Sequence, residues 1–182
     1  MGIIIAIVIV ALLVVWVISV QRKLVAQDEL CQNAMSTIGV QQESRWDALT
    51  GMVELIKSYN EHEYNTLRDT IAMRRPVDGN STAEEADAQE QLSGQVMSRL
   101  NVVVERYPEL KANENYAKAM DAVDKYTDQV RTSKMVYNDT ATNYNKLIRQ
   151  IPDSIVASLF GFKTRSYLTV AAEKTEMPSL NV

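Results

Sequence analysis

The hydrophobic pattern of the chain changes about twenty residues from its start. Residues 3–20 hold seventeen apolar side chains and one serine, with no charged residue. An α-helix of eighteen residues reaches about 27 Å, enough to cross the hydrocarbon core of a membrane. Beyond it, apolar residues recur at spacings of four and three, which is typical of helices that bury one face. The pattern therefore predicts a membrane helix followed by amphipathic helices.

We expect residues 1–20 to be an uncleaved transmembrane anchor. The residues that mark this anchor are Ile3, Ile9, Leu13, Trp16 and Val20. The indole of Trp16 falls near one end, where such rings prefer the headgroup level. The alternative is a cleaved signal peptide, which would begin with basic residues and end in a small-residue cleavage site. The start of the chain has no basic side chain and the sequence around Ser19 makes a poor cleavage site, so the anchor is favoured.

Arg22 and Lys23 follow the apolar segment directly, whereas only the terminal amine precedes it. Basic residues beside a membrane helix favour the cytoplasmic side. We therefore expect a single-pass protein of the cell (inner or cytoplasmic) membrane, with its N-terminus outside and residues 21–182 in the cytoplasm.

Two long heptad stripes predict the main helices of the remaining chain. The first stripe is Leu24, Asp28, Cys31, Met35, Ile38, Gln42, Arg45, Leu49, Met52, Ile56 and Tyr59, and eight of its eleven positions are apolar or aromatic. The second is Tyr116, Met120, Val123, Thr127, Val130, Lys134, Tyr137, Ala141, Tyr144, Ile148 and Ile151, with nine of eleven suited to a core. No proline separates Val20 from the first stripe. A single rod of about 55 residues, or about 85 Å, is therefore expected.

Turn and cap residues divide the rest. Residues 76–79 read as a turn, and Ser81 and Thr82 stand three residues before Glu84 and Glu85, a doubled capping-box pattern. Further boundaries are expected at Pro108, Asn113 and Pro152. The fold predicted is all-α: an antiparallel bundle of about four helices over residues 21–163, continuous with the anchor, and a loosely ordered tail over residues 164–182.

The composition limits the kinds of partner and site that the chain can have. Lys and Arg number 19 against 23 Asp and Glu, a net charge of −4, which argues against a nucleic-acid partner. One cysteine excludes an internal disulfide or a multi-cysteine metal site, and Cys31 lies on the first stripe as a buried thiol. The single His62 lacks the second histidine of a zinc-protease motif, because position 66 is Thr. We expect no catalytic residues, no metal and no cofactor.

Polar residues interrupt the stripes at Gln42, Arg45 and Lys134. Such residues can fix the register between helices, by pairing with a carboxylate or by extending the charged end to solvent. The alternative is a ligand site centred on Gln42 and Arg45. Phe160 and Phe162, after the last helix, are candidate contacts for a protein partner.

Several segments together resemble the LemA family of bacterial membrane-anchored proteins. They are Arg22-Lys23-Leu24-Val25, residues 33–41, residues 52–59 followed by His62-Glu63, residues 105–113, Tyr137-Asn138-Asp139 with Tyr144-Asn145, and residues 151–163. The resemblance implies an N-terminal membrane helix, a helical bundle and no established catalytic activity. It also implies an association with membranes, since some relatives are tied to membrane remodelling in organelle-forming bacteria.

The function expected is that of a non-enzymatic scaffold that self-associates on the membrane, since heptad stripes pair between chains as readily as within one. The alternative is a monomeric anchored adaptor that presents its bundle to another membrane protein, for example a protease. The expected partners are membrane lipid and further copies of the chain, or, for the adaptor, another membrane protein.

Overall fold

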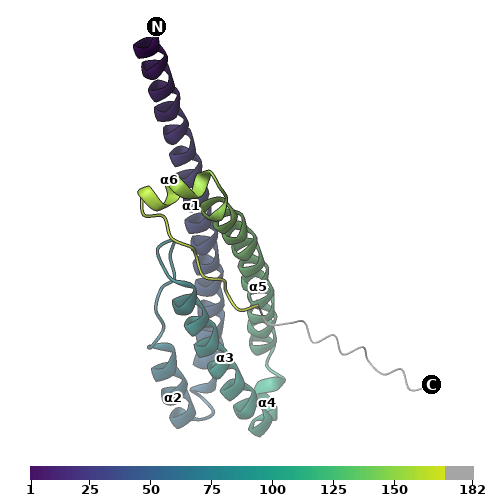
Figure 1. Ribbon diagram of the computed structural model, residues 1–182. Helices are drawn as coiled ribbons and strands as arrows, with labels where there is room; N and C mark the ends of the chain where they lie inside the picture. Colours follow the sequence, from purple (N-terminus) through teal and green to yellow (C-terminus); the bar gives the residue numbers. More distant parts are fainter. Residues whose placement is uncertain (171–182) are drawn as a thin grey trace, which may run out of the picture.

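The computed structural model describes residues 1–170, and over that range the chain forms six helices and no strand (Figure 1). The helices are α1 (Gly2–Ile56), α2 (Glu61–Ile71), α3 (Ala83–Arg106), α4 (Pro108–Lys111), α5 (Glu114–Arg149) and α6 (Asp153–Leu159). α1 and α5 lie antiparallel along each other, and α2 and α3 pack beside them. The predicted all-α bundle is confirmed, and the short helices α4 and α6 raise the number of helices above the four expected.

Helix α1 runs unbroken from the apolar segment into the bundle. Its 55 residues reach about 83 Å. Between Leu24 and Ile56, every position of the first stripe is buried except Asp28, including the polar Gln42 and Arg45. The predicted rod is confirmed, because the four–three spacing keeps one face of the helix toward its neighbours over this whole length.

The second stripe faces the same core from α5. Most of its positions are buried, whereas Thr127 is exposed; the buried ones are Tyr116, Val123, Val130, Lys134, Tyr137, Ala141, Tyr144 and Ile148. The last predicted position, Ile151, is instead 84% exposed. The predicted stripe is one position too long, because α5 ends at Arg149 and the chain turns into α6.

Side-chain caps fix where three helices begin. The Thr82 side chain accepts from Glu85 N at 3.2 Å and the Glu85 carboxylate accepts from Thr82 N at 2.8 Å, so this pair forms the capping box before α3. Asn113 caps α5 by accepting from Asn115 N, as predicted. Asn60 caps α2 by accepting from Glu63 N. Each cap satisfies an amide that the helix itself leaves without a partner.

The connection between α2 and α3 lies along α1. Gly39 of α1 is in close contact with the backbone carbonyl of Val77, and Gly79 lies against Gln32 and Ser36. Any side chain at Gly39 would overlap that carbonyl, so the glycine permits the close approach.

The chain after α6 runs back along the bundle (Figure 1). Residues 165–169 are hydrogen-bonded to α5 and α3, and Leu168 is buried. The expectation of a loosely ordered tail from residue 164 is therefore wrong for this segment, which we call the C-terminal strap (residues 165–169). Residues 171–182 lie outside the described part of the chain.

Candidate functional site

The first part of α1 projects beyond the bundle (Figure 1). Residues 3–15 are all exposed, among them Ile3, Ile9 and Leu13 of the predicted anchor. The one polar side chain of the apolar segment, Ser19, donates to Val15 O at 2.9 Å within the helix. Among the described residues, α1 is the one helix long and apolar enough to span a membrane. A projecting apolar surface of this size supports membrane association.

The last turn of the apolar segment belongs to the bundle as well. Val20 is buried, and Trp16 and Val17 are partly buried, in a cluster that they form with Tyr144, Ile148, Val156, Ala157 and Phe162. The bundle therefore begins at Trp16 rather than at residue 21, and the predicted anchor overlaps it by about one turn. The last turn of the apolar segment is thus packed into the bundle.

The two basic residues after the anchor differ in their surroundings. Arg22 is exposed, whereas Lys23 Nζ lies 3.2 Å from Asp153 Oδ2 at the start of α6. The phenylalanines proposed for partner contact also differ. Phe160 is exposed, but Phe162 packs against the buried cluster and offers a partner little surface.

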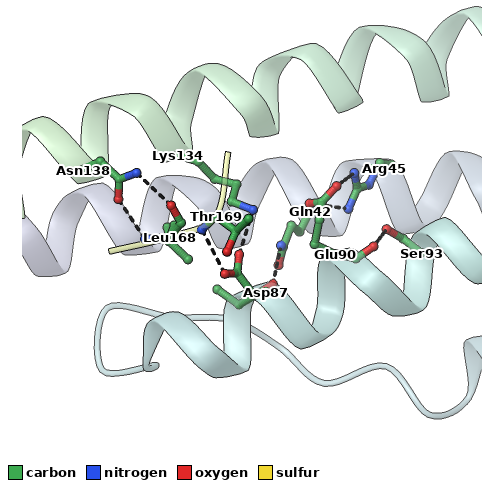
Figure 2. A network of polar contacts seen from close by, with 10 residues as sticks. Gln42, Arg45, Asp87, Glu90, Ser93, Lys134, Asn138, Leu168 and Thr169 are labelled. Carbon is green, nitrogen blue, oxygen red and sulfur yellow. Dashed lines mark hydrogen bonds and ion pairs between the residues drawn. The ribbon is translucent and has the colours of Figure 1, made fainter. Parts of the chain in front are cut away.

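A polar network in the middle of the bundle links three helices (Figure 2). Arg45 of α1 donates two hydrogen bonds to Glu90 of α3, at 2.9 and 3.1 Å. Gln42, one turn earlier, donates to Ala86 O at 3.2 Å. Lys134 of α5 lies with Nζ 2.8 Å from Asp87 Oδ1, and the amide of Thr169 donates to Oδ2 of the same carboxylate. Each buried cation thus faces a carboxylate on α3.

This network fits a role in register better than a role in ligand binding. A one-residue slip of α3 would move Asp87 and Glu90 away from Lys134 and Arg45 and leave both charges buried. The cleft beside the network measures about 240 Å³ and is lined by Asp87, Glu90, Lys134 and Thr169 among others. That volume is below the range of about 300–1,000 Å³ typical of small-molecule sites.

The residues that hold the C-terminal strap were not predicted from the sequence. Asn145 accepts from Arg165 N and donates to Arg165 O, both at 2.9 Å. Asn138 pairs in the same way with Leu168 N and O. A Tyr-Asn pair occurs at 137–138 and again at 144–145, and this seven-residue repeat was the available sequence signal, since it places both amides on one face of α5.

Arg165 connects the strap to α1. Its guanidinium lies 2.8 Å from Asp28 Oδ1, which explains the acidic residue on the first stripe. Beside this pair, burial and the nearby Asp28 carboxylate raise the pKa of Tyr144 to about 12. Burial also raises the pKa of the Cys31 thiol, so this buried cysteine remains protonated and unreactive at neutral pH.

His62 is exposed at the second position of α2, and its carbonyl accepts from Thr66 Oγ1. Within residues 1–170, no three His, Cys, Asp or Glu side chains are grouped so that they could hold a metal ion.

Comparison with known proteins gives a family and a few partial relatives. The LemA family matches residues 34–181. Magnetosome proteins MamQ 2 and MamQ 1 of Paramagnetospirillum magneticum strain AMB-1 are each 32% identical over 74 residues, which cover 41% of this chain and 27% of theirs. MamQ of Magnetospirillum gryphiswaldense is 28% identical over a stretch of the same length. The match thus spans about a quarter of these curated relatives.

Proposed function

The chain belongs to the LemA family, and from this premise and its geometry we propose that it is a membrane-anchored, non-catalytic scaffold whose copies associate side by side and organise the membrane. The observation that carries the proposal is the continuity of α1. One helix contains both the apolar segment and the core stripe of the bundle. Bundles held this way share one orientation relative to the membrane, which favours repeated lateral contacts.

The surface for self-association is the side of the α1–α5 pair that faces away from the core stripes. A shallow groove there is lined by Gln27, Leu30, Asn33, Ala34, Thr37, Val136, Thr140 and Asn143. None of these side chains is charged, and Leu30 and Val136 are about half exposed. A strip without charges can meet a second copy of itself without burying an unpaired ion.

We further propose that the anchor crosses the cell membrane once, with the N-terminus outside. Arg22 and Lys23 support this orientation. The similar relatives are named magnetosome proteins, and we propose for this chain a role at a membrane in the same broad sense. The alternative function is a monomeric adaptor whose groove receives a helix of another membrane protein.

The test is the mass of the full-length protein extracted together with its native lipid. We expect a discrete oligomer, and we expect Val136→Lys to convert it to monomers because a charge would be buried between copies. Val102→Lys is the matched control, since Val102 is a valine of similar exposure (46%, against 55% for Val136) on α3, outside the groove. A wild-type monomer would contradict the scaffold and favour the adaptor, as would an oligomer that both variants leave intact.

A further inference from the structure

We propose that α6 is a second membrane contact: its outer apolar face lies at the headgroup level of the bilayer that α1 crosses, beside anionic phospholipids. This inference rests on the proposed membrane anchoring. It adds to a single-pass anchor a short helix that lies along the membrane surface and limits the tilt of the bundle.

The outer face of α6 is apolar and uncovered. Ile155 and Leu159, four residues apart on α6, are 63% and 74% exposed, and Ile151, just before the helix, is 84% exposed. Phe160, directly after the helix, is 53% exposed. The opposite face of α6 is covered by protein, because Val156 and Ala157 are buried against α1 and α5. Four large exposed apolar side chains around a seven-residue helix indicate a surface that contacts a membrane or another protein rather than water.

The position of α6 along α1 indicates that the membrane covers the outer face of α6. α6 crosses α1 where the apolar segment ends (Figure 1), in contact with the cluster that contains Trp16 and Val20. Residues 3–15 alone reach about 20 Å, which is shorter than the hydrocarbon core of about 30 Å. The membrane must therefore extend over the last turn of the apolar segment, and this brings its boundary to α6.

Charge around α6 supports contact with anionic lipid. Residues 21–31 and 144–165 hold six Lys and Arg against three Asp and Glu, although the whole chain carries −4. Two of those acids are paired, Asp153 with Lys23 and Asp28 with Arg165. Arg22, Lys146, Arg149 and Lys163 are exposed at this end. These exposed basic side chains around α6 attract the anionic headgroups of a bilayer.

The test places nitroxide labels on the full chain in lipid nanodiscs and compares their collisions with oxygen, which concentrates in lipid, and with a water-soluble nickel complex. Single cysteines replace Ile155 or Leu159 in a Cys31→Ala background. Ile9→Cys reports the anchor, and Val102→Cys is the control for an exposed apolar residue far from the membrane. Unchanged thermal unfolding of each labelled protein shows that the fold is retained.

We expect the ratio of oxygen to nickel collisions at 155 and 159 to exceed that at 102 several-fold, and to fall when anionic phosphatidylglycerol is replaced by neutral phosphatidylcholine. Water-like ratios at 155 and 159 with a lipid-like ratio at 9 would overturn the inference but leave the anchor intact. A water-like ratio at 9 would overturn the anchoring itself. Labels at 155 and 159 shielded from both reagents would overturn it in favour of a protein partner. Equal ratios in both lipids would overturn the role of anionic lipid.

Discussion

At the scale of single residues, Arg45 and Glu90 form an ion pair but differ in burial. This difference determines how much the loss of each side chain lowers the free energy of unfolding. The Arg45 side chain is 4% exposed, whereas Glu90 is 33% exposed. Glu90→Gln leaves a buried guanidinium without a counter-charge, so we expect it to lower the free energy of unfolding by about 3 kcal/mol. Arg45→Leu leaves a carboxylate that can reach water, and we expect a change within about 1 kcal/mol. Denaturant unfolding of the full chain in detergent measures both.

The double variant Arg45→Leu with Glu90→Gln is the control. We expect its stability to match that of Arg45→Leu alone, because the charge that made Glu90→Gln costly is gone. If Arg45→Leu proved much the more damaging of the two single changes, the assignment of the buried charge would be wrong. If it instead removed function while stability was kept, the ligand-site alternative for Gln42 and Arg45 would gain support.

Tyr144 gives the bundle a predicted sensitivity to high pH. Its pKa is raised to about 12 in the folded chain, against 10 for the unfolded one. The stability that this group contributes is therefore fully present below pH 10 and is lost as the pH rises from 10 to 12, by about 3 kcal/mol in all. Stability measured between pH 9 and 12 should fall less steeply for Tyr144→Phe than for the wild type. Parallel pH profiles for the two proteins would contradict the prediction.

At the scale of elements, two glycines of α1 that look alike in the sequence have opposite surroundings. Gly39 touches the Val77 carbonyl, whereas a side chain at Gly51 would meet nothing within 4 Å. We expect Gly39→Ala to destabilise the chain by about 2 kcal/mol, since the backbone opposite must move. Gly51→Ala should stabilise it by about 1 kcal/mol through helix propensity. Thermal unfolding compares the two, and equal effects would argue against the close approach of the loop at residue 77.

Much of the element pattern is predictable from the sequence, because it depends on local spacing. The stripe from Leu24 to Ile56 and the caps at Thr82 and Asn113 are short-range features, and the structure confirms them. The partners of Arg45 and Lys134 were not predictable, since they depend on how far α3 slides along α1. The strap was not predicted, because it lies beyond the heptad stripes and is held by side chains elsewhere in the fold, such as Asn138 and Asn145 of α5 and the distant Asp28 of α1. A heptad pattern carries no information on such returns of the chain.

At the scale of the whole molecule, the polar network and the membrane-end cluster serve one arrangement. Arg45 of α1 and Lys134 of α5 both pair with carboxylates of α3 at the middle of the bundle. The cluster around Val20 fixes α1 against α6 near the end of the apolar segment. Together these contacts hold α1 at the start of the bundle and again at its middle. The bundle is therefore expected to follow the tilt of its anchor as one rigid body.

A proline in this connecting stretch tests that rigidity. Ala26 is exposed, so Ala26→Pro removes no packing but deletes one hydrogen bond of α1 and clashes with the carbonyl of residue 22. We expect a kink, a loss of about 3 kcal/mol, and a broad distribution of distances between spin labels at Ile9→Cys and Met73→Cys, measured by pulsed electron resonance in a Cys31→Ala background. Ala26→Gly, which costs about 1 kcal/mol but keeps the hydrogen bond, should retain the narrow distribution of the parent. A broad distribution already in the parent would mean that anchor and bundle move independently, and a scaffold that depends on a shared orientation would then lose its physical basis.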